Sequence, residues 1–103
     1  MPARGQYRFD IPPHVGGVIR HLAPDIKRSV RAALRALAGD PDLGEPLIGE
    51  LHGFWKYRVR RFRIVYAVGR RERVIRVVAV GHRRGIYNEA AALVRRRRAS
   101  AAD

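Results

Sequence analysis

Two short stretches of the sequence carry side chains that are able to bind a phosphate group. The first contains Lys56, Arg58 and Arg63 and no acidic residue, and the second contains Arg83 and Tyr87. An arginine guanidinium presents a planar fork of N–H donors that holds a phosphate at two points. Fixed cations also stabilise the extra negative charge of a phosphate under attack. These residues therefore indicate a site for a phosphate-bearing ligand.

Strand alternation predicts where these cations point. Residues 54–60 and 62–68 are typical of two β-strands. In the first strand one face carries basic residues and the other carries residues interpreted as core, namely Lys56, Arg58 and Arg60 against Trp55, Tyr57 and Val59. In the second strand the apolar face that the helices need is formed by Phe62, Ile64, Tyr66 and Val68. Arg63 is therefore expected on the open face beside Lys56 and Arg58, where unpaired cations repel by ~1 kcal/mol per close pair. A polyphosphate would relieve that repulsion.

The residues after the last predicted strand form a second cluster. Residues 73–81 are β-branched and nearly continuous, as expected of a strand buried on both faces. The side chains at its C-terminal mouth, a natural place for a site, are His82, Arg83, Arg84 and Tyr87. We interpret His82 as a structural residue rather than a base. Tyr87 fits a core position and a site position equally well.

The charge distribution favours a polyanionic partner. The 103 residues carry 22 Lys and Arg against 9 Asp and Glu, a formal net charge of +13. Residues 54–98 hold 15 of these cations, with Glu72 and Glu89 as their only acids. Such a block favours nucleic acid first, an acidic protein second and an anionic membrane third. Genome bias towards arginine does not explain why acids vanish from one half only. The four arginines at 95–98 are interpreted as a solvated helix end, with RNA, ribosome or acidic-partner contact as alternatives.

Composition and length restrict the class of protein. The length predicts one domain over residues 1–103. The absence of Cys excludes disulfides and thiol chemistry and removes the usual ligands of structural zinc, so we expect neither a metal nor a cofactor. No apolar run is long enough to span a bilayer, and the first ten residues lack the apolar middle of a secretory signal. We therefore expect a cytoplasmic protein with no membrane contact.

The remaining pattern predicts an α+β fold. Residues 7–11 alternate as a first strand, and apolar stripes after Pro13 and Pro24 predict an antiparallel helical hairpin that stops at Gly39. Residues 42–53 are expected to form a loop, and Asn88 to cap a short final helix. The result is a small, mainly antiparallel sheet with the helices on one face. We expect its core at about 7–89, followed by a basic helix and tail at 90–103.

One extended motif resembles a known family. It reads "LIGELHGFWKYRVRRFRIVYAV", followed by "VIRVVAVGHRRGIYNE". This pattern, with the strand and helical hairpin that precede it, resembles the RelE/ParE superfamily of bacterial and archaeal toxins from type II toxin–antitoxin systems, and its RelE-like branch in particular. The resemblance covers about residues 7–89 and implies a RelE-like fold for the single domain.

The RelE-like branch cuts messenger RNA in the ribosomal A site without a metal, by attack of the 2′-hydroxyl on the adjacent phosphate. By motif, Arg63 and Arg83 match arginines that stabilise the pentavalent phosphate, and Tyr87 matches a tyrosine that stacks on a base or assists proton transfer. Lys56 and Arg58 match a basic pair, although Arg58 stands where the best-studied members have Lys. Arg is a poor base, so proton transfer is left to Lys56, Tyr87, His82 or the ribosome. RNA or ribosome contacts are expected from Arg60, Arg61, His82, Arg84, Arg95 and Arg96.

Three functions remain open from the sequence. The first is a ribosome-dependent mRNA endoribonuclease, the second a ParE-like poison that engages DNA gyrase without cutting RNA, and the third a nucleic-acid-binding protein without catalysis. ParE-like chains tend to lack the phosphate-binding arginines, so Arg63, Arg83 and Tyr87 favour the first. Both toxin hypotheses imply a cognate antitoxin whose acidic, disordered segment wraps the domain and folds on binding, giving a toxin–antitoxin hetero-oligomer.

Overall fold

The computed structural model describes residues 6–102; residues 1–5 and the final residue of the expected tail lie outside it. In chain order the elements are β1 (Arg8–Asp10), α1 (Pro13–Arg20), α2 (Pro24–Gly39), η1 (Pro41–Leu43), β2 (Glu45–Pro46), η2 (Gly49–Leu51), β3 (Trp55–Val59), β4 (Phe62–Gly69), β5 (Val74–His82) and α3 (Ile86–Ala102). Both helices of the hairpin begin at a proline, whose fixed φ suits the first turn of a helix.

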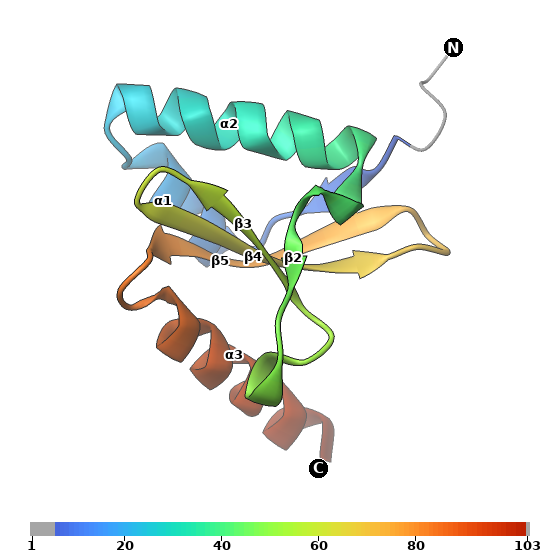
Figure 1. Ribbon diagram of the computed structural model, residues 1–103. Helices are drawn as coiled ribbons and strands as arrows, with labels where there is room; N and C mark the ends of the chain where they lie inside the picture. The colour runs from blue at the N-terminus through green and yellow to red at the C-terminus, as the bar shows by residue number, and fades with distance from the viewer. Residues whose placement is uncertain (1–5, 103) are drawn as a thin grey trace.

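The strands form one five-stranded sheet in the order β1-β5-β4-β3-β2. Only β1 and β5 run parallel, and the other neighbours are antiparallel. The hairpin of α1 and α2 covers one face of this sheet, while α3 covers the other (Figure 1). The mainly antiparallel α+β fold with the helical hairpin on one face is thus confirmed, whereas the expectation that the other face is open is wrong, because α3 packs on it.

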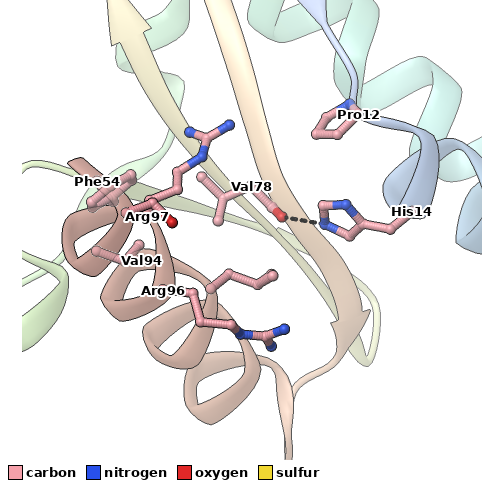
Figure 2. Close-up of a pocket in the computed structure, with 9 residues that line it drawn as sticks. Pro12, His14, Phe54, Val78, Val94, Arg96 and Arg97 are labelled. Carbon is pink, nitrogen blue, oxygen red and sulfur yellow. Dashed lines mark hydrogen bonds between the residues drawn. The ribbon is translucent and has the colours of Figure 1, made fainter. Parts of the chain in front are cut away.

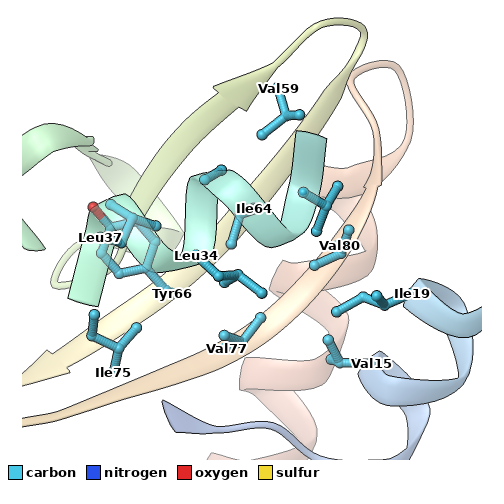
Figure 3. Packing of buried hydrophobic residues seen from close by; sticks show 12 residues of the cluster. Val15, Ile19, Leu34, Leu37, Val59, Ile64, Tyr66, Ile75, Val77 and Val80 are labelled. Carbon is cyan, nitrogen blue, oxygen red and sulfur yellow. The ribbon is translucent and has the colours of Figure 1, made fainter. Parts of the chain in front are cut away.

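The first core fills the space between the sheet and the α1–α2 hairpin (Figure 3). The apolar stripe of α2 presents Val30, Leu34 and Leu37 to the sheet. From the sheet side Ile64 and Tyr66 of β4 pack against it, as strand alternation predicts. Trp55, Tyr57 and Val59 join the same core, so the predicted apolar face of that strand is confirmed.

The second core lies beneath α3 and corrects the prediction of a short final helix. The helix has 17 residues and begins at Ile86, so Asn88 lies inside its first turn and is not its cap. Ala90, Ala91 and Val94 are buried against the sheet. Ile86 packs so closely over Gly81 that a Cβ at Gly81 would lie 3.0 Å from its Cδ1. The first residue of α3 is therefore the one whose side chain packs on β5 at Gly81.

A β-bulge divides β5 into two halves, and the side-chain alternation of the second half is shifted by one residue relative to the first. Val65 of β4 pairs with Ala79 and Tyr66 pairs with Val77, which leaves Val78 as an extra residue without a β4 partner. A bulge shifts side-chain alternation by one residue. Val77 packs into the first core, whereas Val78 and Ala79 face the second.

A buried tyrosine fastens the segment before β2 to the sheet. The hydroxyl of Tyr66 donates a 2.8 Å hydrogen bond to the carbonyl oxygen of Pro41, and burial raises the pKa of Tyr66 to about 12. Gly44 lies directly over this hydroxyl, and a Cβ there would also lie 2.6 Å from the carbonyl oxygen of Lys56. The close approach requires glycine, because any side chain would push β2 away from β3.

Candidate active site

A cationic groove opens on the α3 face of the sheet, beside the first turn of α3. It encloses about 360 Å³ and is lined by Glu45, Lys56, Arg58, Arg63, Arg83, Arg84 and Tyr87. The structure thus brings together all five side chains that the sequence nominated for catalysis, with Arg84 from the predicted RNA-binding set. Their catalytic role stays a prediction.

The central pair of adjacent strands supplies three of the cations. In the ladder of β3 and β4, Arg58 stands directly opposite Arg63, and Lys56 stands opposite Val65. Val65 belongs to the core beneath α3, so all of these side chains project to that face. Like charges directly opposite one another destabilise a sheet. The fold therefore keeps two arginines where an anion between them would be favoured.

Arg63 is held in place by its own hairpin. Its Nη1 donates to the carbonyl oxygens of Phe62 at 2.7 Å and of Arg60 at 3.0 Å. Only one guanidinium nitrogen is used, which leaves the other nitrogens of the fork available to a ligand. The hairpin turn thus positions a donor in advance, which is what electrostatic stabilisation of a charged intermediate needs.

Arg83 and Tyr87 reach the groove from the far side. The backbone N–H of Arg83 donates to the carbonyl oxygen of Arg61 at 2.8 Å, which continues the β4–β5 pairing beyond the end of β5. Tyr87 lies in the first turn of α3, partly buried against the second core. The Nζ of Lys56 lies 5.8 Å from the centre of its ring, within cation–π range. Tyr87 therefore occupies a core position and a site position at once.

Sequence reasoning missed Glu45, the carboxylate that lines the groove. Glu45 belongs to the two-residue strand β2 and pairs with Lys56 of β3. Its Oε2 lies 4.0 Å from the Nζ of Lys56, and its side chain is 75% exposed. A carboxylate beside a reactive phosphate can accept a proton, which the arginines cannot. Residues 42–53 were expected to be a loop because no alternation marks so short a strand.

Three residues of the predicted RNA-binding set lie elsewhere. Arg60 occupies the hairpin turn with φ of 55° and pairs with Asp25 of α2 at 3.1 Å. The prediction that Arg60 shares a face with Lys56 is wrong, because left-handed backbone at a turn ends strand alternation. Arg60, Arg61 and His82 line a separate hollow with Phe62 and Ile26. His82 is thus on the α2 side of the sheet, outside the cationic groove.

The two remaining arginines of that set lie along α3. Arg95 forms an ion pair with Glu50 of η2. Arg96 lines a further hollow near the C-terminal half of the helix. Neither residue lines the cationic groove.

The groove combines five cations with one carboxylate. Among residues 6–102, no three His, Asp or Glu side chains come together in a way that could hold a metal ion. In the same part of the chain, no helix has the length and apolar character needed to cross a membrane. The chemistry of the groove itself is that of an anion site with one proton acceptor.

A family model matches this chain over residues 16–87, from α1 to the groove tyrosine. The model is described as "ParE toxin of type II toxin-antitoxin system, parDE". The chain belongs to this toxin family. It is therefore a toxin of the type II toxin–antitoxin class, as the resemblance to the RelE/ParE superfamily implied. A search of curated proteins found no sequence that matches.

Solved structures share the fold of this toxin. A mutant of E. coli toxin RelE in the free state is 21% identical, with a TM-score of 0.72 over 89% of this chain and 97% of that one. The toxin–antitoxin complex RelBE2 from Mycobacterium tuberculosis gives 22% identity and a TM-score of 0.70 over 81% and 98%. The archaeal RelE–RelB complex from Pyrococcus horikoshii gives 20% and 0.63 over 76% and 96%. At this identity the likeness concerns the fold.

Proposed function

We propose that this toxin is a ribosome-dependent endoribonuclease that cleaves messenger RNA and so inhibits translation, without a metal ion. The observation that carries the proposal is the groove that Arg58 of β3, Arg63 of β4 and Arg83, just after β5, line together. Glu45 lines the same groove. A surface for passive RNA binding needs only spread cations. A focused cluster with a proton acceptor is what attack on one phosphate requires.

The reaction divides into bond changes and charge stabilisation. The 2′-oxygen of one nucleotide attacks the adjacent phosphorus, the bond to the 5′-oxygen of the next nucleotide breaks, and the products carry a 2′,3′-cyclic phosphate and a 5′-hydroxyl. The pentavalent intermediate carries more negative charge than the diester. Arg63 and Arg83 stabilise that charge from two sides, and Arg58 adds a third cation opposite Arg63.

Two proton transfers complete the reaction. Glu45 takes the proton of the attacking 2′-hydroxyl, since it is the carboxylate that lines the groove, and Lys56 holds it there through their 4.0 Å pair. In this proposal the Tyr87 hydroxyl gives a proton to the leaving 5′-oxygen, while its ring stacks on a base. His82 takes no part, because it lies outside the groove. The ribosome aligns the mRNA for in-line attack, as positioning supplies much of such catalysis.

The partners follow from this role. The similar structures include complexes of RelE with RelB, so we expect this toxin to bind a cognate antitoxin in a hetero-oligomer. Its target would be the translating ribosome and its mRNA in the cytoplasm. Arg84, which lines the groove, and Arg61, which lines the separate hollow beside the β3–β4 turn, would contact RNA phosphates.

The decisive experiment adds purified toxin to ribosomes programmed with a defined mRNA and maps breaks by primer extension. We expect breaks within the A-site codon and 2′,3′-cyclic phosphate ends. The matched control is Glu45→Gln, which keeps the size of the side chain and removes the proton acceptor. Intact mRNA with the unaltered toxin would refute the proposal.

A second candidate is a ParE-like poison of DNA gyrase that cuts no RNA, and the description of the matching family model favours it. The same protein preparation therefore goes into a gyrase supercoiling assay. Blocked supercoiling together with intact mRNA would assign the toxin to this second class.

A further inference from the structure

The hollow that Arg96 lines lies between the start of α1 and the C-terminal half of α3, away from the cationic groove (Figure 2). It encloses about 310 Å³. Its apolar lining comes from Phe54, Val78, Leu93 and Val94. No acidic residue lines it. The hollow shares none of its lining residues with the cationic groove.

The bulge in β5 creates the floor of this hollow. Val78 is the bulged residue and has no paired residue on β4. His14 of α1 reaches across instead, and its Nε2 lies 3.1 Å from the carbonyl oxygen of Val78 (Figure 2). With its proton on Nε2, His14 donates a hydrogen bond to this part-buried carbonyl oxygen. An entering group meets a mainly apolar floor formed by Phe54, Val78, Leu93 and Val94, so the hollow suits an apolar side chain.

Two arginines at the rim add a preference for negative charge. Arg96 and Arg97 both line the hollow and are exposed. Within residues 6–102 neither makes an ion pair, whereas the neighbouring Arg95 is paired with Glu50. Unpaired cations beside an apolar hollow complement an acidic segment that carries an apolar side chain.

Two exposed apolar residues lie on or just before α1, the helix that supplies His14 to the hollow. Ile11 and Val18 are 38% and 37% exposed, and they are two of the four large apolar residues that the described chain exposes. Val18 follows His14 by four residues and so lies on the same side of α1. Exposed apolar surface next to a hollow is typical of a protein interaction site.

We propose that this hollow is a docking site for an acidic segment of the antitoxin. One apolar side chain of the segment fills the space above Val78, and its carboxylates lie beside Arg96 and Arg97. A nucleic-acid backbone is a poorer occupant, because phosphates and sugars offer no apolar group for the floor. The proposal rests on membership of the toxin family and is independent of the RNA-cleavage proposal, since a gyrase poison needs an antitoxin as well.

The test measures binding of a short synthetic peptide, with two Leu flanked by Glu, to the full chain by NMR titration. We expect shifts confined to residues around the hollow in α1, β5 and α3. Replacing Leu by Ser in the peptide should abolish binding. Arg97→Glu, which reverses a rim charge, and Ser100→Trp, which fills the hollow from an exposed position, should each weaken binding roughly tenfold or more.

The matched control is Arg98→Glu, which makes the same charge reversal on the same helix but does not line the hollow. It should change the affinity by less than about twofold. Equal weakening by Arg97→Glu and Arg98→Glu would overturn the proposal, because attraction would then be diffuse. No binding at about 1 mM peptide, shifts at the cationic groove, or displacement of the peptide by a short single-stranded RNA would overturn it too. None of these measurements involves a ribosome, so they stand apart from the cleavage assay.

Discussion

Replacing Arg63 by alanine tests the proposed chemistry most directly. Arg63 lines the groove, faces Arg58 across the ladder and is fixed by two hydrogen bonds to its own turn. If it stabilises the pentavalent phosphate, the variant loses one preorganised donor. Loss of one such donor costs about 2.7–4 kcal/mol of barrier, or about 10²–10³ in rate.

The Arg63→Ala change should alter the free energy of unfolding very little. The variant loses hydrogen bonds to two turn carbonyls, one of them exposed, each with a net value of about 1 kcal/mol at most because water replaces the donor. It also loses the repulsion from Arg58 directly opposite, worth ~1 kcal/mol for a close pair in water. The two effects nearly cancel. We therefore expect the melting temperature to move by only a few degrees.

The assay is single-turnover cleavage on programmed ribosomes, with thermal melts of each variant. Arg71→Ala is the matched control, since Arg71 is an exposed arginine in the β4–β5 turn outside the groove. Arg63→Lys should recover part of the rate, because it restores charge without the planar fork. The double change with Arg83→Ala should be less than additive, since both arginines hold one phosphate. Unaltered cleavage by the Arg63→Ala variant would show that Arg63 is a solvated strand residue without a role in cleavage.

Four further outcomes follow. Binding to ribosomes or RNA should weaken steeply between low and physiological salt, because each phosphate contact releases counterions; a flat profile by filter binding would exclude the basic face as the docking surface. Glu45→Gln should lower the cleavage rate by about 10²–10⁴ with unchanged ribosome affinity; a normal rate would assign the proton transfer elsewhere. The raised pKa of Tyr66 means that the unfolded chain loses that proton first, so stability should fall between about pH 10 and 12 by up to about 2–3 kcal/mol. Urea unfolding of Tyr66→Phe, which has no such proton, should lack that fall; the same fall in both proteins would contradict the assignment. Gly44→Ala should cost about 1–3 kcal/mol, because its Cβ would lie 2.6 Å from the Lys56 carbonyl oxygen, whereas Gly85→Ala, with open space around it, serves as the control in the same melts.

The sequence alone predicted β1, the α1–α2 hairpin, β3, β4 and β5, and it nominated for catalysis five of the side chains that line the groove. It did not predict β2 or the full length of α3. Alternation separates Lys56 and Arg58 from the aromatic face of β3, because side chains of a strand point to opposite faces whatever the fold around it. The same rule places Arg63 on the face of β4 that is opposite to the face of the buried Ile64. The net charge and its concentration in residues 54–98 could also be read from the sequence, since they depend on composition and not on packing.

The tertiary structure decided where the two halves of the site meet. Ile75 and Val77 of β5 pack into the first core, so unbroken alternation from them would carry Arg83 to that side, away from Arg63. The bulge at Val78 shifts the pattern by one residue and turns Gly81 and Arg83 to the α3 face. No local signal marks that bulge, because Val78 lies in a continuous run of small apolar residues.

Glu45 illustrates the same limit from another direction. Its two-residue strand exists only because β3 offers a free edge beside it, and its carboxylate enters the groove only because Gly44 lets the chain lie against Tyr66. Glu45 pairs with Lys56 and Pro46 pairs with Trp55 across an irregular loop, and the local pattern of residues 42–53 does not encode that pairing. A sequence therefore reveals which side chains a strand presents to each face, whereas packing between elements decides which of them share one site.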